Sequence, residues 1–520
     1  MKRGLTLLFL AGAVSLQAGD LDTIGVTVLR QVDPALTGSG VKVAQPEAPL
    51  SADSPPPFEI NPAAAGQPTN LFTWISSLGS ATVYTNSVGT ESWHANVVAA
   101  NFYGLTNGPA TNVMHVDNYE CVNLFNAFIA YPGTAIPARV VNQSFIYDHS
   151  DELLVNTNYD NYAAQRGTIF VSGINGINNV QPICAPGSCY NGIGVGAYYA
   201  FSLPGPTDDG RCKPDLIAPD QAQYPNGAVS YATPYVSASA AILVQAANRG
   251  DGGANTNAAG DLRTIKALLL NGAIKLIGWT NGPATPLDAR YGAGMVNVFN
   301  SWQQLKGGRR GFIESTTVSS GGAHPPGANA GNEPTLVGWD YNTISTTATQ
   351  DAINHYYFNL TGSNAFTLTA TLVWNKQYKA TNINDLNLFL YNTANSNLVV
   401  CSTSMVDNVE HIFLPALPVG RYDLQVLKRG SATQVSAIET NALAFEIFTM
   451  PLSVRQTNSN AFIAWPVAPT GFQLQSATSL APPVSWTSVT NTVSITNSQN
   501  AVTVPIGAGS QFFRLIRPLF

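Results

Sequence analysis

Between residues 38 and 307 the chain alternates short apolar runs with alanine-rich stretches whose apolar positions recur at helical spacing. The apolar runs predict buried β-strands, and the alanine-rich stretches predict α-helices. Strands that alternate with helices are typical of a parallel sheet covered by helices. The predicted strands are 41–44, 138–143, 168–173 and 192–197, and the predicted helices are 96–102, 119–128, 233–248 and 262–271.

A different pattern begins near residue 355, where short segments alternate apolar and polar positions. Segments such as FTLTATLVW and RYDLQVLK have the period of half-buried strands and predict an antiparallel β-sandwich over 353–449. The preceding segment, 308–352, is rich in Gly, Ser, Thr and Pro and predicts a linker or irregular segment. Strand-like segments in 450–520 predict a small C-terminal β module. The predicted fold class is therefore an α/β domain over 19–307 followed by all-β modules.

The first residues have the pattern of an export signal. Lys2 and Arg3 are followed by an apolar core, 4–14, that is too short to span a bilayer. Small residues permit cleavage after Ala18 or after Ala13, and we take 1–18 as the signal peptide. No later stretch reaches the roughly 20 apolar residues of a membrane span. We therefore expect a protein that is secreted or held in a bacterial-type cell envelope, with no stable membrane span after cleavage.

Composition narrows the classes of partner. Only 10% of the 520 residues are charged and 45% are hydrophobic, whereas about 25% is a usual charged fraction. The net charge of −6 is mild, so the chain lacks the basic character of a protein that binds nucleic acid or anionic lipid. We expect neither as a partner. A chain of this length has room for about three domains.

The cysteines and histidines do not form a recognisable metal motif. Five cysteines occur, without a CxxC pair, and the six histidines are scattered. We therefore place no metal site. Cys184 and Cys189 flank an Ala-Pro-Gly-Ser turn, so export to an oxidising compartment favours a small disulfide loop between them. The odd number of cysteines leaves at least one unpaired in a monomer.

The segment KPDLIAPDQAQYPNGAVSYATPYVSASAAILVQ, 213–245, places one serine at the start of a predicted buried helix. Ser230 lies four residues before Pro234, which suits a first helical turn. The segment resembles the Gly-Thr-Ser-Met-Ala-x-Pro nucleophile segment of subtilisin-like serine proteases, with Ala228 and Val229 in place of Gly and Thr. The resemblance implies that Ser230 is the nucleophile. Taken alone, a serine at this position is better explained as a helix cap.

A serine nucleophile needs a general base, and the base needs an acid that orients it. The segment SWHANVVAA, 92–100, resembles the family's His-Gly-Thr-His-Val-Ala-Gly, which implies that His94 is the base. The segment GSGVKVA, 38–44, resembles the strand that leads to the family's acid, and continuing without a gap puts Glu47 at the acid position. Asp33 and Asp53 are the alternatives. The order acid, histidine, serine is that of the family.

An oxyanion donor is expected after the strand that ends at Gly173. The family has Asn after Ala-Ala-Gly, whereas TIFVSGIN, 168–175, puts Ile174 at that position and Asn175 one residue later. A shift in the turn would make Asn175 the donor, and Asn178 and Asn179 are alternatives. Asparagines in such a segment also form turns.

Other segments extend the resemblance over about 38–307. VVNQSF at 140–145, YNGIGVGA at 190–197 and YGAGMVN at 291–297 resemble family segments in the family's order, and NDLNL at 384–388 resembles the jelly-roll domains that follow many secreted subtilases. The family binds substrate as an added β-strand. It implies a main side-chain pocket lined by Ser144, Phe145, Ile146, Val171, Ser172 and Gly173.

Together these motifs predict an exported serine endopeptidase that acts on proteins or peptides, with Glu in the acid position. The replacement of family residues at Ala95, Ala228 and Val229 supports an alternative, a catalytically impaired subtilisin-fold protein that binds peptides or forms part of a cell envelope. We expect no required cofactor. Subtilases commonly bind structural calcium, but no acidic loop here has the ligand spacing that would place a site. The sequence does not specify the oligomeric state.

Overall fold

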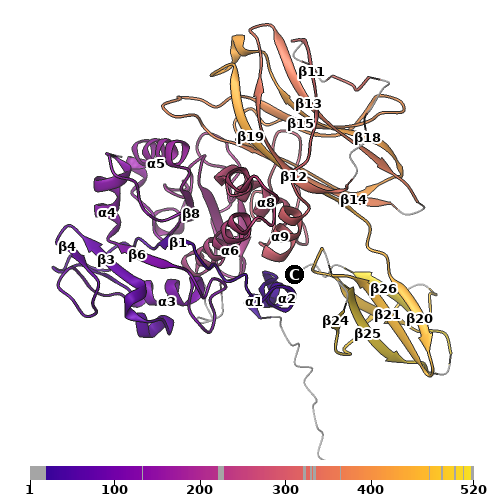
Figure 1. Cartoon of the computed structure of the whole chain (residues 1–520), viewed down its shortest axis with the longest axis horizontal. Helices are drawn as coiled ribbons and strands as arrows, with labels where there is room; N and C mark the ends of the chain where they lie inside the picture. Colours follow the sequence, from indigo (N-terminus) through magenta and orange to yellow (C-terminus); the bar gives the residue numbers. More distant parts are fainter. Residues whose placement is uncertain are drawn as a thin grey trace, which may run out of the picture.

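The computed structural model describes residues 19–131, 133–220, 228–319, 322, 324–327, 331, 335–362, 365–467, 469–481, 484–496, 499–507 and 509–516. An α/β part comes first along the chain, a β-sandwich follows, and a small β module comes last (Figure 1). The expected signal peptide lies outside the described residues. Among the helices of the described part, none combines the length and apolar character needed to cross a membrane.

An eight-stranded sheet forms the centre of the α/β part, in the order β10-β9-β8-β7-β1-β6-β3-β4. Neighbouring strands are parallel except in the β3–β4 hairpin. The four strands predicted from apolar runs are β1, β7, β8 and β9, so the prediction of a parallel α/β sheet is confirmed. The bounds are β1 (Lys42–Ala44), β3 (Phe72–Ser76), β4 (Gly79–Ala81), β6 (His115–Tyr119), β7 (Val140–Gln143), β8 (Ile169–Gly173), β9 (Ile193–Ala197) and β10 (Leu216–Ala218), with β2 (Pro57–Glu59) and β5 (Thr90–Glu91) paired separately.

Helix α6 (Val229–Arg249) packs against β7, β8 and β9. Its many Ala and Ser residues are buried, because small side chains let a helix approach a sheet closely. Gln245 near its C-terminal end accepts hydrogen bonds from the backbone of 37–39, just ahead of β1. The other helices are α1 (Asp20–Thr23), α2 (Val26–Val32), α3 (Trp93–Phe102), α4 (Cys121–Leu124), α5 (Glu152–Arg166), α7 (Thr256–Ala259), α8 (Leu262–Asn271) and α9 (Val298–Lys306).

The helix predicted over 119–128 begins later than expected. Tyr119 is the last residue of β6, and the helical residues are α4 and a π-helical turn, Phe125–Ile129. The carboxylate of Glu120 accepts hydrogen bonds from the backbone N–H groups of Val122 and Asn123 and so caps the first turn. Hydrophobicity alone did not reveal this boundary, because the strand end and the helix are both apolar.

Two antiparallel sheets form the β-sandwich, in the orders β11-β13-β18-β15-β16 and β12-β19-β14-β17. The predicted sandwich is confirmed, but 308–352, which we expected to be a linker or irregular, contains β11 and β12. Strand β11 is largely exposed, so the sequence lacks the alternation of apolar and polar residues that would predict a strand there. The bounds are β11 (Ile313–Val318), β12 (Val337–Ser345), β13 (Gln350–Leu360), β14 (Phe366–Trp374), β15 (Leu386–Asn392), β16 (Asn397–Ser402), β17 (Val409–Leu417), β18 (Gly420–Lys428) and β19 (Ile438–Phe448).

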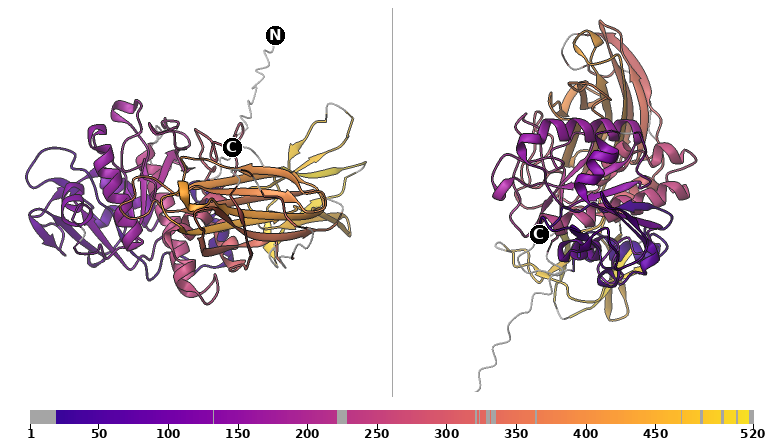
Figure 2. Two further views of the ribbon diagram at one scale, coloured as in Figure 1. Left: turned by 90° about the horizontal axis from the view of Figure 1, so that it is seen from above. Right: turned by 90° about the vertical axis from the view of Figure 1, so that its left-hand side faces the viewer.

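The sandwich packs on α8 and α9 (Figures 1 and 2). Trp339, Val373 and Ala444 of the sandwich belong to the same apolar cluster as the core of the α/β part. The buried side chain of Asn271, the last residue of α8, accepts hydrogen bonds from the hydroxyls of Thr369 and Thr371 on β14. Both apolar and polar contacts therefore join the two parts.

The C-terminal module has its own small core around Ile463, Trp465 and Val502. Its two sheets have the orders β20-β21-β25-β24 and β23-β22-β26. The bounds are β20 (Ser453–Thr457), β21 (Asn460–Pro466), β22 (Gln473–Ala477), β23 (Thr487–Ser488), β24 (Ser494–Thr496), β25 (Gln499–Pro505) and β26 (Phe512–Ile516).

All five cysteines are free thiols, so the predicted Cys184–Cys189 disulfide is wrong. The intervening residues do form a turn. The two thiols, however, take different partners, since Cys189 donates to the Asn156 side chain and Cys184 contacts the carbonyl of Pro182.

Candidate active site

Glu47 lies beyond the carboxyl end of β1 and is fully buried. Its backbone continues the pairing with the neighbouring strand β6, because its N–H donates to the carbonyl of Tyr119 and its carbonyl accepts from the N–H of Cys121. The segment between β1 and Glu47 is therefore extended, and the carboxylate is held at the edge of the sheet where the parallel strands end.

His94 is the second residue of α3, and Ser92 caps that helix by accepting from the N–H of Ala95. The Nδ1 atom of His94 lies 2.7 Å from Oε2 of Glu47. Burial alone would lower the pKa of His94, but the charge of Glu47 and its hydrogen bond outweigh burial and raise the pKa above its usual value. The structure thus brings the predicted base and the predicted acid into direct contact.

Gln45 supports this contact and was not identified as a site residue from the sequence. Its Nε2 donates to the second oxygen of Glu47 at 2.8 Å and to the carbonyl of Ala95 at 2.9 Å, and its Oε1 accepts from Tyr103 at 2.7 Å. Gln45 is fully buried. The sequence signal for this role was an amide side chain two residues before the predicted acid, because a polar group that is buried needs hydrogen-bond partners.

Ser230 is the second residue of α6, whose N-terminal end carries a partial positive charge. Its hydroxyl donates to the carbonyl of Ser144 at 3.4 Å, and its own carbonyl accepts from the Ser144 hydroxyl at 3.0 Å. Across the described ranges, no hydrogen bond joins Ser230 to His94. The serine is therefore turned toward the residue that follows β7.

Two features bring the helices of His94 and Ser230 to the same edge of the sheet. Helix α3 packs against α6, and Asn101 of α3 donates to the carbonyl of Tyr231 at 3.2 Å. Gly173 at the end of β8 lies so close to α6 that an added Cβ would be 2.9 Å from side-chain atoms of Val229 and Thr233. Glycine is therefore needed here for close packing.

The residues after Gly173 do not present a side-chain donor to Ser230 in the described contacts. Ile174, at the family's Asn position, is fully buried in a small cluster with Ile183 and Leu203. The amide of Asn175 donates to Asn179 at 2.7 Å, and its oxygen accepts from the N–H of Gly176. Asn178 and Asn179 have φ angles of 55° and 59° and so form the turn. Asn175 as the oxyanion donor stays a prediction.

The segments expected to line the substrate pocket lie next to Ser230. Val171 and Ser172 are buried within β8, while Phe145 and Ile146 are partly exposed beyond β7. The backbone N–H of Tyr147 donates to the carbonyl of Ala185, which joins the segment after Ser144 to the loop before β9. No residue at this site has a metal-ligand arrangement among the described residues, and the cluster that has one, His149, Glu152 and Asp208, lies elsewhere.

A second chain of serine, histidine and carboxylate occurs in the sandwich and was not predicted. Ser315 Oγ lies 2.7 Å from His355 Nε2, and His355 Nδ1 lies 2.7 Å from Asp423 Oδ2. Ser315 is exposed on β11, whereas His355 on β13 and Asp423 on β18 are buried. Gln425 also donates to Asp423. These residues come from three strands that are far apart in the sequence, so no local sequence motif predicts their contact.

A family model matches within the α/β part. Residues 79–294 match the model of the subtilase family. This segment is similar to that family. The matched range contains His94 and Ser230, in agreement with the motifs, while Glu47 precedes it. The subtilase segment supports a serine peptidase as the coarse class of activity.

Solved structures align with parts of this chain at low identity and low TM-score. Tripeptidyl peptidase 2 aligns with 12% identity and a TM-score of 0.32, covering 75% of this chain and 44% of its own. The enzymatically active domain of tailspike protein 4 from bacteriophage CBA120 aligns with 11% identity and a TM-score of 0.17, covering 26% and 19%. This chain thus spans less than half of tripeptidyl peptidase 2. A search of curated proteins finds no match.

Proposed function

We propose that this protein is an exported serine endopeptidase in which Ser230, His94 and Glu47 form the catalytic triad. The observation that carries the proposal is the 2.7 Å contact between His94 and the buried carboxylate of Glu47, beside the helix that begins at Ser230. Glutamate serves as the triad acid on other folds. The subtilase match supports the assignment of His94 and Ser230.

Each residue has a defined step in this mechanism. Ser230 Oγ leaves the Ser144 carbonyl, gives its proton to His94 Nε2 and attacks the carbonyl carbon of the peptide bond. Glu47 accepts from His94 Nδ1 and stabilises the imidazolium. His94 then protonates the leaving amine, and water, activated by the same imidazole, hydrolyses the acyl-enzyme. The positive end of α6 favours the oxyanion that develops on the substrate.

The substrate would bind as an extended strand along Ser144, Phe145 and Ile146. This segment is suited to that role because its first residue contacts Ser230 and the next two are partly exposed. The opposite wall would come from Val171, Ser172 and Gly173. Export is proposed from the pattern of residues 1–18, and no cofactor enters the mechanism.

Two observations favour a second candidate, a subtilisin-fold protein without hydrolytic activity that binds peptides. Ser230 donates to the Ser144 carbonyl rather than to His94, and an apolar side chain, Ile174, stands at the position of the family's oxyanion donor. Both features reduce catalysis while leaving the substrate-binding edge intact.

Labelling with a fluorophosphonate separates the two candidates, because the reagent modifies serines that an adjacent base activates. We expect the purified protein to be labelled at Ser230, as located by peptide mass spectrometry, and Ser230→Ala to abolish the label. Ser315→Ala is the matched control, since Ser315 also contacts a histidine, and should label like the wild type. A folded wild-type protein that takes up no label at Ser230 would contradict the peptidase proposal and favour the peptide-binding candidate.

A further inference from the structure

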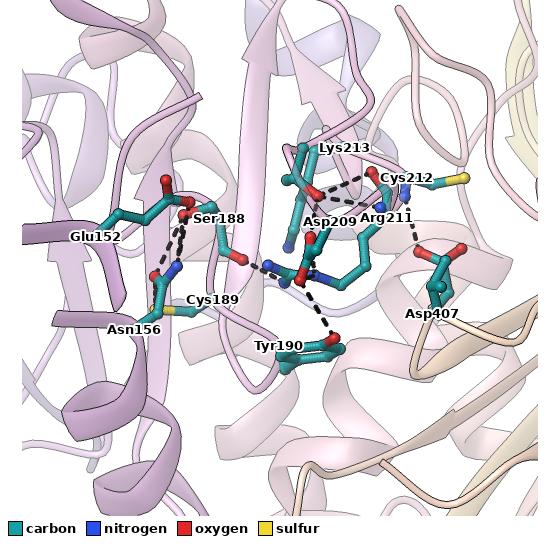
Figure 3. A network of polar contacts seen from close by, with 12 residues as sticks. Glu152, Asn156, Ser188, Cys189, Tyr190, Asp209, Arg211, Cys212, Lys213 and Asp407 are labelled. Carbon is teal, nitrogen blue, oxygen red and sulfur yellow. Dashed lines mark hydrogen bonds and ion pairs between the residues drawn. The ribbon is translucent and has the colours of Figure 1, made fainter. Parts of the chain in front are cut away.

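A cavity of about 300 Å³ lies between α5, two loops of the α/β part and the sandwich. Helix α5 contributes one wall, the loops around 190 and 208–211 contribute another, and Lys376 closes the sandwich side. None of the three proposed catalytic residues lines it. Figure 3 shows part of the polar network around this cavity, with Glu152 and Asn156 on one side and Asp209 and Arg211 on the other.

Three side chains at the cavity have metal-binding chemistry. His149 Nδ1 lies 2.9 Å from a Glu152 oxygen, and His149 Nε2 lies 3.4 Å from an Asp208 oxygen. One ligand atom from each residue can be chosen so that all three lie within 4.8 Å of one another. Ligands about 2.0–2.2 Å from a shared ion are at most about 4.4 Å apart. Small side-chain movements would therefore complete the set, and Asp208 is exposed and free to make them.

A buried carboxylate lines the same cavity further along α5. Asp160 is only 2% exposed, and its Oδ2 has no hydrogen-bond partner among the described residues. Its other oxygen accepts from the backbone N–H of Asn191. Glu152, Asn156 and Asp160 are spaced by four residues along α5 and all line the cavity. Asp160 therefore lies about 12 Å along the helix from Glu152 and contributes to the polar wall of the cavity rather than to the ligand set.

The charges around the cavity favour a cation. Four carboxylates line it, those of Glu152, Asp160, Asp208 and Asp209, against two cationic side chains. Arg211 is paired with Asp209 at 2.9 Å and stacks on Tyr190, and the ammonium of Lys376 also lies over that ring. Asp209 therefore balances Arg211, which leaves an excess of negative charge toward His149.

We propose that His149, Glu152 and Asp208 bind a divalent transition-metal ion of the zinc class. One imidazole nitrogen and two carboxylate oxygens are ligands that such an ion accepts, with water in the remaining position. Calcium fits less well, because it takes six to eight oxygen ligands.

The ion would join two segments that are distant in the sequence: residues 149–152, which connect the loop after Ser144 to the start of α5, and the loop of Asp208. Residues 144–146 are the proposed substrate edge, so metal binding would restrain that edge from its far end. This consequence rests on the proposed peptidase function, whereas the binding of the metal does not.

The test uses the full chain with Ser230→Ala, which removes self-cleavage, after removal of any affinity tag and treatment with a chelator. Calorimetric titration with Zn²⁺ should show one equivalent bound, and Co²⁺ should give visible absorption bands from the same site. Adding His149→Ala, which removes one of the three protein ligands, should weaken binding by at least about 100-fold. Asp208→Asn, on an exposed side chain, repeats the ligand test if His149→Ala does not fold.

His115→Ala is the matched control. His115 is also partly exposed and lies 3.4 Å from a carboxylate, that of Asp117, but outside the proposed site. Its loss should leave the titration unchanged. Absence of stoichiometric zinc binding, equal loss in the two histidine variants, or preference for Ca²⁺ over Zn²⁺ would each overturn the proposal. Because the protein tested lacks Ser230, none of these results depends on peptidase activity.

Discussion

Among the described residues, two arrangements of serine, histidine and carboxylate differ in what surrounds the serine. In the sandwich, Ser315, His355 and Asp423 form an unbroken chain with two contacts of 2.7 Å. In the subtilase segment only the acid–base contact is formed, and Ser230 bonds to a backbone carbonyl. Hydrogen-bond geometry alone would therefore favour the sandwich chain over the proposed triad.

The surroundings of the two serines instead favour Ser230 as the nucleophile. Ser230 begins a 21-residue helix whose N-terminal end favours a developing negative charge. Ser315 lies within a β-strand, and sheets have only small net dipoles. A catalytic serine needs both an activating base and stabilisation of the oxyanion. The comparison teaches that stabilisation of the oxyanion distinguishes the two sites. Four experiments test whether catalysis depends on the residues around Ser230 and not on those around Ser315.

The largest expected effect comes from Glu47→Gln. The amide has nearly the same shape but cannot hold the imidazole in the required tautomer, so kcat should fall about 10⁴-fold, as for loss of the acid in other triads. Asp423→Asn is the equivalent change in the sandwich and should leave kcat unchanged. Peptide hydrolysis by both variants checks this. A Glu47→Gln enzyme with near wild-type kcat would contradict Glu47 as the triad acid.

The pH dependence of labelling should report the pKa of His94. Only neutral imidazole acts as the base, and Glu47 raises the pKa of His94 above 6.5. The rate should therefore rise with pH through a midpoint above 6.5 and fall about tenfold per pH unit on the acid side. Measured labelling rates between pH 5 and about 9 give the midpoint. A midpoint at or below 6.5 would contradict the Glu47–His94 contact in solution.

A smaller effect is expected for Gln45→Met, which keeps an unbranched side chain but removes the hydrogen bond to Glu47. Hydrogen bonds to charged groups contribute about 1.5–3 kcal/mol, and part of this is lost only as the imidazolium forms. We expect kcat to fall about tenfold with KM nearly unchanged. Gln425→Met, which removes the corresponding donor to Asp423, is the control. An equal loss in both variants would indicate a general effect on folding.

The smallest effect on activity is expected for His355→Ala. This change leaves the buried Asp423 with Gln425 as its remaining side-chain partner, so it should destabilise the sandwich by about 1–3 kcal/mol. Urea unfolding followed by sandwich tryptophan fluorescence measures the loss, and hydrolysis by the folded variant should match the wild type. Loss of hydrolysis in a folded His355→Ala protein would show that the sandwich chain takes part in catalysis.

The sequence predicted those parts of the site that lie next to a local pattern. Glu47 follows a buried strand in register, His94 begins a small-residue helix and Ser230 begins another, so their motifs were sufficient to propose all three. Gln45 was missed because its role depends on contacts with Ala95 and Tyr103, which are distant in the sequence. The Ser315 chain was missed for the same reason.

Prediction of the fold from the sequence was limited in the same way, to elements that have a local pattern. Buried parallel strands such as β8 have continuous apolar runs and were found, whereas α5 was not, because its polar residues, among them Glu152, Asn156 and Asp160, face a cavity rather than solvent. The exposed edge strand β11 has no buried face and was taken for a linker. Asn175 and its neighbours form a turn whose side-chain directions no motif specifies.

The apolar cluster that runs from the α/β core into the sandwich sets where this chain can be recombined with others. A chimaera cut after residue 307 would strip α8 of the strands β14 and β19 that cover it, and would leave the amide of Asn271 without its two threonines. The last module has a core of its own, but Val467 belongs to the α/β cluster and Thr470 donates to the side chain of Asn300 on α9, so a cut between β19 and β20 also removes contacts from the α/β part. For gene shuffling, the α/β part and its sandwich therefore form one cassette, and any module that replaces the last one must restore the contacts of Val467 and Thr470.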